Sequence, residues 1–257
     1  MPALDVDLDL QPTRHEDGSV SYDVGGATVR VRRSGTGWDY TGPGGSAALH
    51  LEGLDGEGRH VDGRRGATGD SSPLRFGVRL AQDEAVARFA TPVFVPRFAR
   101  TELWIAWPLE VVVVAGDHEI DRLLPGRRQT LFGTVNEGRV LPTAVCEPVL
   151  GPADPALAGR PRAALSVRIH NRGKEPARLS RVPVNGALLA LHRAGDSFAA
   201  TAVKVDLQDG GQAEASAQAG LPPEGFTTVA EPPPQTGQIA QLGWLLDATR
   251  RSVEYPL

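Results

Sequence analysis

Three carboxylates occupy alternate positions near the start of the chain, at Asp5, Asp7 and Asp9, with apolar residues between them. In a strand every second side chain points to the same face, so these carboxylates would line one face about 7 Å apart. Oxygen ligands at such a spacing can hold a hard cation such as Ca²⁺. No turn glycine or bidentate Glu follows at the spacing of a calcium loop. We therefore interpret the stripe as the wet face of a first strand and expect no bound metal.

Glu110 is the one carboxylate within the apolar run 103–115. A buried carboxylate tends toward a raised pKa, which suits a general acid. Glu110 is thus the first candidate for a hydrolase that uses a carboxylate pair, with carbohydrate as substrate. Aromatic residues, which form sugar platforms, make up only 5% of the chain. The alternative, which we favour, is that Glu110 marks the end of a strand or pairs with a buried arginine.

Two further segments, 55–62 and 116–119, combine histidine with carboxylates, a ligand set that suits transition metals. Neither has the His-Glu-x-x-His spacing of a zinc hydrolase. Cys146 is the single cysteine of the chain, so it has no second cysteine with which to form a zinc site. We interpret both segments as polar turns.

The sequence contains no motif that is typical of nucleophilic catalysis. Gly-x-Ser-x-Gly is absent, and Glu147 would raise the pKa of the adjacent Cys146 thiol. His170 and His192 flank expected strands, and we expect both to face solvent. The short Gly-x-Gly sequences lack the third glycine of a phosphate-binding loop. We therefore assign no catalytic, cofactor-binding or metal-binding residue, and favour a protein that is not an enzyme.

Charge is distributed unevenly along a chain whose net charge is −4. Residues 160–181 hold seven basic side chains and one acidic side chain, whereas 1–23 hold six acids with one base and 206–231 hold five acids without a base. One interpretation of 160–181 is an anion-binding face for an acidic protein, a lipid headgroup or a polynucleotide. Because 160–181 lacks the aromatics that stack on bases, we do not expect nucleic acid. We favour neutralisation of the basic segment by the acidic ones.

The elements that must position these side chains are strands. Glycine (30 residues) and proline (21 residues) argue against a helical bundle, because both break helix interiors. Apolar and polar residues alternate with the period of two that half-buried strands show, over 29–32, 74–80, 165–170 and 203–207. The apolar face of each such strand must be covered by another sheet. This predicts an all-β fold of antiparallel sheets packed as β-sandwiches. The run 103–115 predicts two paired strands in the centre of the core, with a corner at Pro108.

The second half of the chain carries an immunoglobulin-like signal. A strand over 164–171 ends in Asn, a polar turn contains Gly173, and a returning strand covers 177–184. This order is common in immunoglobulin-like sandwiches, where Asn and Gly tolerate the left-handed turn conformation. The parity of apolar residues shifts near Ser180-Arg181, which predicts a β-bulge.

Three segments rich in glycine, charge or proline predict loops and a domain boundary. Residues 52–72 are rich in glycine and charge and predict a long mobile loop, and the proline-rich 220–234 predicts an extended surface segment. Five prolines in 142–161 predict an interdomain connection. We expect a β-rich half over 1–150 and an immunoglobulin-like half over 151–257, with one continuous domain as the alternative.

The C-terminal segment 236–253 is the one candidate helix. Its apolar residues recur at spacings of three and four, and Asp247 and Arg251 form a favourable i,i+4 pair. Gly243 lies in its middle and lowers helix propensity. A terminal strand is therefore the alternative.

Composition also predicts where the protein resides. No apolar run approaches the roughly 20 residues that a membrane helix needs, and the N-terminal residues lack the basic and apolar regions of a secretory signal. A single cysteine fits a reducing compartment. Lysine supplies only two of the 27 basic side chains, a bias typical of a high-GC bacterial genome. We expect a cytoplasmic bacterial protein without a membrane span.

Residues 93–140 and 165–184 resemble an uncharacterised prokaryotic family, domain of unknown function 432. The resemblance lies in Phe94-Val-Pro-Arg, in the strand pair that starts at Leu103, and in Leu131-Phe-Gly-Thr-Val-Asn-Glu-Gly-Arg-Val, followed by the strand and turn of 165–184. It implies an all-β architecture and no established activity.

Together these features favour a non-catalytic binding or assembly module without a cofactor. An open sandwich offers edge strands to a protein partner or to a second copy of the chain. The alternative function is the carbohydrate hydrolase with a carboxylate pair.

Overall fold

The computed structural model describes residues 8–35, 37–45, 48–52, 74–81, 83–115, 118–132, 139–209, 213–218 and 220–232. Within these ranges the regular structure is strand, apart from three short 3₁₀ turns at Pro43–Gly45, Pro155–Leu157 and Gly186–Leu188. The all-β prediction is confirmed. No helix in the described part of the chain is long and apolar enough to cross a membrane. The predicted helix over 236–253 and all but residue 52 of the predicted loop over 52–72 lie outside the described residues.

Contacts divide the chain into two compact units that interleave along the sequence. The first contains residues 1–79, 109–125 and 159–161, and the second contains 80–108, 126–158 and 162–257. Residues 150 and 151, on either side of the predicted division, both lie in the second unit.

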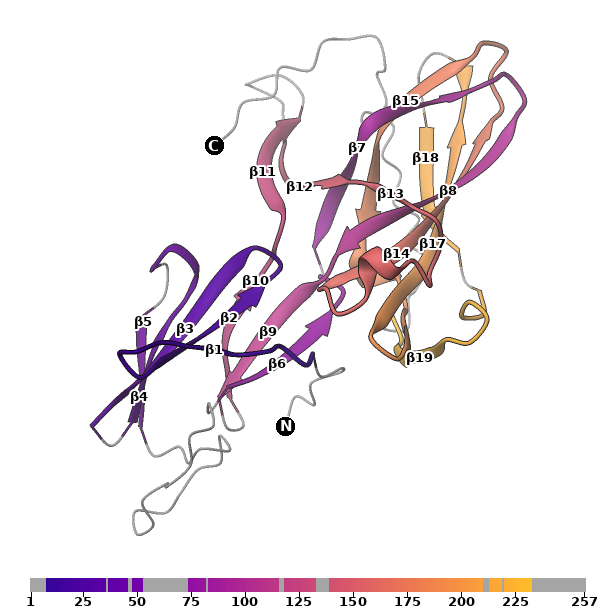
Figure 1. Ribbon diagram of the computed structural model, residues 1–257. Helices are drawn as coiled ribbons and strands as arrows, with labels where there is room; N and C mark the ends of the chain where they lie inside the picture. The colour runs from indigo at the N-terminus through magenta and orange to yellow at the C-terminus, as the bar shows by residue number, and fades with distance from the viewer. Residues whose placement is uncertain are drawn as a thin grey trace. The chain divides into compact units, whose positions relative to one another are not determined.

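The first unit contains two antiparallel sheets (Figure 1). One is a meander of β1 (Thr13–Arg14), β2 (Ser19–Val24), β3 (Ala27–Ser34), β4 (Gly37–Thr41) and β5 (Ala48–Glu52). The other has β9 (Glu110–Ala115) between β10 (His118–Leu123) and β6 (Leu74–Arg79). Val29 and Val31 are fully buried and alternate with exposed arginines, so the predicted alternation of β3 is confirmed. β9 is buried at every position, as its valine run predicts.

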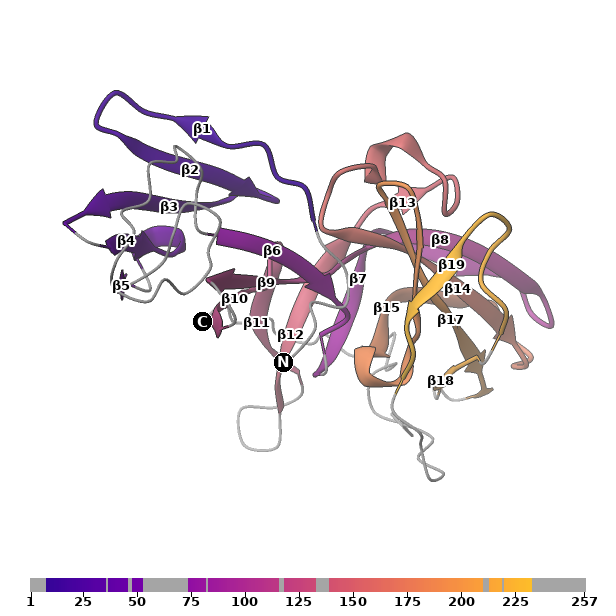
Figure 2. The ribbon, with the colours of Figure 1, turned by 90° about the horizontal axis from the view of Figure 1, so that it is seen from below.

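The second unit is a β-sandwich. Its four-stranded sheet has the order β11 (Arg127–Phe132), β12 (Arg139–Cys146), β7 (Glu84–Val95), β15 (Ala177–Asn185). Its seven-stranded sheet has the order β13 (Pro148–Val149), β8 (Arg100–Pro108), β14 (Arg162–Asn171), β17 (Ser197–Leu207), β16 (Leu191–Ala194), β19 (Thr227–Ala230), and β18 (Ala213–Ala217) also pairs with β17. Figure 2 shows β7 and β15 on one side of this unit and β8, β14 and β17 on the other. Two pairs, β7 with β12 and β14 with β17, are parallel.

Several strand predictions need correction in their pairing. The run 103–115 does form two strands around Pro108, but β8 and β9 pair in different sheets rather than with each other. β14 and β15 also belong to different sheets, so the turn between them connects the two layers of the sandwich. The predicted bulge is confirmed, because the pairing of β15 with β7 shifts between Leu179 and Arg181.

The proline-rich segments contain more regular structure than their composition suggests. Pro142 lies within β12 and pairs with Gln129, so the first part of 142–161 is strand rather than connection. β19 similarly occupies part of 220–234. Pro142 is tolerated because tertiary pairing outweighs its low strand propensity.

Candidate functional site

Three strands of the seven-stranded sheet bring charged side chains from distant parts of the sequence onto one face. Arg168 on β14 lies opposite Glu102 on β8 and opposite Lys204 on β17. His170 on β14 lies opposite Arg100 and Asp206 in the same way. Side chains two residues apart on a strand point to the same face, so these rows form a continuous charged surface.

This surface is hollowed into a groove of about 470 Å³. Its lining residues are Arg100, Thr101, Glu102, Arg168, Ile169, His170, Arg172, Lys204 and Gln218. Four of the lining side chains are cations and one is a carboxylate. The groove therefore presents an excess of positive charge.

Arg168 is held at the centre of the groove. Its Nε donates to Glu102 Oε1 at 3.2 Å, and its Nη1 donates to Gln218 Oε1 at 3.0 Å. The hydroxyl of Ser166 donates to the same Glu102 oxygen at 2.6 Å. The Ser166 hydrogen bond, together with Arg168, holds the pKa of Glu102 below its usual value.

Asp206 anchors the other side of the groove. Its carboxylate accepts from Lys204 Nζ at 2.6 Å and from Arg172 Nε at 3.1 Å, and His170 Nδ1 lies 3.4 Å away. Burial raises the pKa of Asp206, but Lys204 and Arg172 outweigh it and lower the pKa below its usual value. Asp206 is therefore ionised, and its carboxylate is occupied by hydrogen bonds to Lys204 and Arg172.

Arg100 differs from the other cations of the groove. Its side chain is exposed, and among the described residues it has no hydrogen-bond or ion-pair partner. A guanidinium offers five donors in a planar fork that matches carboxylate and phosphate oxygens. Arg100 is therefore ready to bind an anion without breaking an internal contact.

A turn next to the groove fixes the start of β8. The buried Asn171 side chain donates from Nδ2 to the carbonyl oxygens of Val95, Pro96 and Glu175, at 3.1, 3.2 and 2.9 Å. Its Oδ1 accepts from the Gly173 amide at 3.0 Å. The β7–β8 and β14–β15 connections are thus joined at one end of the second unit, where Figure 1 shows them together.

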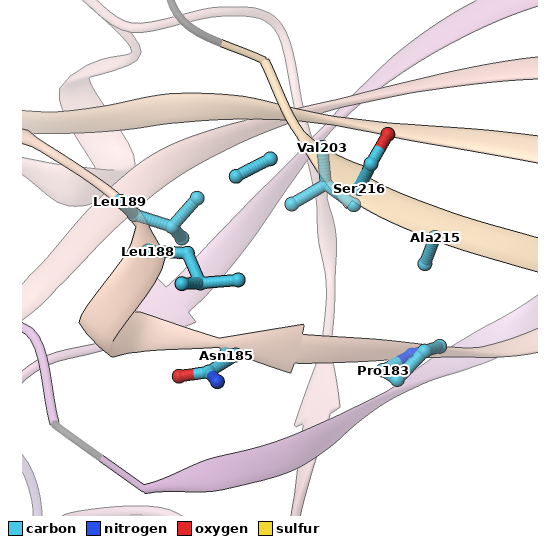
Figure 3. Close-up of a pocket in the computed structure, with 8 residues that line it drawn as sticks. Pro183, Asn185, Leu188, Leu189, Val203, Ala215 and Ser216 are labelled. Atoms are coloured by element: carbon cyan, nitrogen blue, oxygen red, sulfur yellow. The ribbon is translucent and has the colours of Figure 1, made fainter. Parts of the chain in front are cut away.

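A second, much smaller pocket lies between the two sheets of the sandwich (Figure 3). The side chains of Leu188, Leu189 and Val203 surround its space, with Pro183 and Ala215 nearby. Its volume is about 20 Å³, room for about one water molecule. It is a packing void rather than a ligand site.

Glu110, the carboxylate singled out from the sequence, lies in the first unit and pairs with an arginine. Arg79 Nε donates to its Oε2 at 2.6 Å, and Arg79 Nη1 lies 3.4 Å from Glu119 Oε2. Arg122 also donates to Glu119. Burial raises the pKa of Glu119, but Arg122 and Arg79 outweigh it and lower the pKa below its usual value. Two carboxylates do meet here, but Arg79 binds both, so the favoured interpretation of Glu110 as the partner of an arginine is confirmed.

Cys146 and His192 are both buried. Burial raises the pKa of the Cys146 thiol to about 12, although Arg162 and Arg127 lower it. Burial causes the rise in pKa, rather than the adjacent Glu147 that the sequence suggested. The prediction that His192 faces solvent is wrong: this residue is only 2% exposed, and its Nδ1 is 3.1 Å from Thr228 Oγ1. His170 is half-buried and lines the groove.

The metal-ligand candidates are mostly outside the described residues. Asp5, Asp7 and the segment 55–62 lie outside the described residues. Asp9 is described, and it is exposed and outside any strand. Of the segment 116–119 the structure describes only His118, which is exposed, and Glu119. No group of three metal-ligating side chains occurs in the residues that the structure describes.

The basic segment 160–181 is neutralised only in part. Arg172 pairs with Asp206, which belongs to the acidic segment 206–231, but Arg168 pairs with Glu102 from β8. The acid Asp17, from the segment 1–23, pairs with Arg30 within the first unit.

Sequence reasoning missed Arg100 and Lys204, because neither lies in the basic segment. The alternation of Val203 and Val205 around Lys204 already placed that cation on the wet face of a strand. Nothing in the sequence indicated that β17 pairs with β14 in parallel, which is the contact that brings Lys204 to Arg168.

Comparison with known proteins gives a family but no activity. A search of curated proteins finds no match to the chain, and a search of solved structures finds none. A family model described as "Protein of unknown function (DUF432)" matches residues 12–243. The match includes every strand in the described part of the chain, and the chain therefore belongs to the DUF432 family.

Proposed function

We propose that the protein is a non-catalytic binding module that takes an anionic ligand, bearing phosphate or carboxylate groups, in the groove over β8, β14 and β17. The observation that carries this proposal is the convergence of four cations on one groove of about 470 Å³ with a single lining carboxylate. Arg168 and Arg172 are held in place by Glu102 and Asp206, which preorganises them. Arg100 adds a guanidinium that is open to the ligand.

Isothermal titration of the full chain with pyrophosphate and with citrate, at low ionic strength, tests the proposal. We expect at least one of these anions to bind, and Arg100→Ser to weaken binding by about tenfold, since a charge-assisted hydrogen bond contributes about 1.5–3 kcal/mol. Arg128→Ser removes an exposed cation on β11, outside the groove, and is the matched control. Equal binding by wild type and Arg100→Ser, or no binding of either anion, would overturn the proposal.

No specific observation favours the alternative of a carbohydrate hydrolase. Its first candidate, Glu110, is paired with Arg79, and the pKa of the neighbouring Glu119 is lowered. A general acid needs the opposite shift, because it must hold a proton near neutral pH. Assembly through an edge strand and a cytoplasmic location remain predictions from the sequence.

A further inference from the structure

The end of the second unit beside the groove carries two exposed aromatic side chains. Phe94, near the end of β7, is 66% exposed, and Phe98, in the β7–β8 connection, is 63% exposed. They are the two aromatic side chains among the exposed large hydrophobic residues that the structure describes. Burial of one phenylalanine against a partner is worth about 1.5–3 kcal/mol.

Phe98 is also held in an unfavourable backbone conformation. Its φ is 56°, and it is the one non-glycine residue with positive φ among those that the structure describes. A bulky residue in this left-handed region is strained, and glycine or asparagine would relieve the strain. The turn is nevertheless fixed, because Asn171 binds the carbonyls of Val95 and Pro96 and its own amide donates to the Ala99 carbonyl at 2.9 Å.

Basic residues accompany the two phenylalanines in the connected strand ends and turns. The segments 94–100 and 171–178 together hold five basic side chains and one acid, Glu175. Two further acids adjoin them: Asp209 accepts from the Lys174 amide at 2.8 Å, and Asp206 pairs with Arg172. Arg178 lies directly opposite Phe94 in the pairing of β15 with β7. The side chains of Arg97, Lys174 and Arg178 have no hydrogen-bond or ion-pair partner among the described residues.

The shape of this surface selects among anionic partners. A single-stranded nucleic acid needs a groove in which aromatics and cations alternate, but no aromatic side chain lines the basic groove. Phe94 instead lies one residue before the end of β7, and Phe98 lies in the β7–β8 connection that Asn171 joins to the β14–β15 turn. Exposed apolar side chains at one end of a sandwich, with basic residues on the same strands and turns, match the interface of an anionic bilayer, where acyl chains lie beneath negative headgroups.

We propose that the surface formed by Phe94, Arg97, Phe98, Lys174 and Arg178 docks onto an anionic phospholipid bilayer, with both phenylalanines inserted at the headgroup boundary. The proposal does not depend on the groove, because none of these five residues lines it.

Co-sedimentation of the full chain with vesicles tests the proposal. We expect the protein to sediment with vesicles of phosphatidylcholine mixed with phosphatidylglycerol, not with phosphatidylcholine alone, and to be released by salt. The double variant Phe94→Ser, Phe98→Asn should bind these vesicles at least about tenfold more weakly than the wild type, because it loses the burial of two apolar side chains. Lys174→Glu with Arg178→Glu should abolish binding, because it reverses two charges.

Two controls separate docking from folding. Leu150→Ser removes a 94% exposed leucine beyond β13 and should leave binding unchanged. Phe98→Asn alone should keep or raise the melting temperature while it weakens binding, because asparagine adopts positive φ more readily. Equal binding to neutral and anionic vesicles, or unchanged binding of the Phe94 and Phe98 variants, would refute the docking surface. It would also be refuted if the wild type bound a single-stranded oligonucleotide and no vesicles.

Discussion

Cys146 shows how burial decides the chemistry of a residue. Its side chain is 1% exposed and its pKa is raised to about 12, so the reactive thiolate is scarce at neutral pH. We expect native protein to resist iodoacetamide at pH 7.5 and to react only at a rate set by unfolding. Mass spectrometry of alkylated protein, with a denatured sample as the control, measures this. Rapid alkylation of native protein would show that the thiol is accessible.

His192 makes stability depend on pH. Burial lowers its pKa below the ordinary value of 6.5, although Glu231 acts in the opposite direction. The unfolded state therefore binds the proton more readily, and the free energy of unfolding should fall as pH drops through about 6.5. The stabilisation is fully present above this pH.

Urea unfolding of the wild type and of His192→Gln at a series of pH values tests this dependence. The variant should lose part of the slope between about pH 5 and 7, the window in which histidine titrates. His118→Gln, at an exposed histidine, is the control and should keep the slope of the wild type. Parallel pH profiles for all three proteins would contradict the assignment to His192.

At the scale of elements, Asn171 joins two connections that are distant in sequence. Its side chain supplies buried hydrogen bonds to Val95, Gly173 and Glu175. Asn171→Ala would remove these hydrogen bonds, so we expect a loss of about 1–3 kcal/mol in the free energy of unfolding. Asn185→Ala, which removes one hydrogen bond to the Ala187 amide, should cost less, and chemical denaturation compares the two. Equal costs would mean that the Asn171 bridge adds nothing beyond an ordinary cap.

The strand β8 lies within the core that the apolar run 103–115 predicted. Ile105 is 1% exposed, and Ile105→Ala should lower the free energy of unfolding by about 2–5 kcal/mol. Arg168→Ala, on the exposed face, should change it by about 0.5 kcal/mol at most. Trp104 is half-buried and packs against the buried cluster that contains Ala106 and Leu157. A neutral Ile105→Ala measured by the same denaturation would place β8 outside the core.

The elements that sequence could predict are those with a strong period of two. Val29 and Val31 on β3 and the alternation of β6 identify a strand without reference to its partner. Pairing is different, because the same alternation fits a parallel or an antiparallel neighbour. The basic groove depends on such a pairing, between β14 and β17. The sequence therefore shows each basic residue of the groove, but it does not predict that these residues come together on one face.

At the scale of the whole molecule, the chain passes repeatedly between its two units. The segment 109–125 belongs to the first unit, between 80–108 and 126–158 of the second. Prolines are typical of linkers and therefore predict a boundary between residues 150 and 151, but a proline also occurs within β12, where pairing decides the conformation. Composition alone does not reveal such interleaving.

The interleaving predicts how fragments behave. A fragment of residues 151–257 would contain β14 and β15 but lack β8 and β7, with which they pair. Its sandwich would lose the whole of the four-stranded sheet except β15, and the exposed apolar faces would have no cover. We expect this fragment to lack the dispersed amide spectrum and the cooperative thermal transition of the full chain. A fragment of 1–150 provides the matched comparison: it keeps β6, β9 and β10 of the first unit but loses residues 159–161. A cooperatively folded 151–257 fragment would instead support the division of the chain at residue 150.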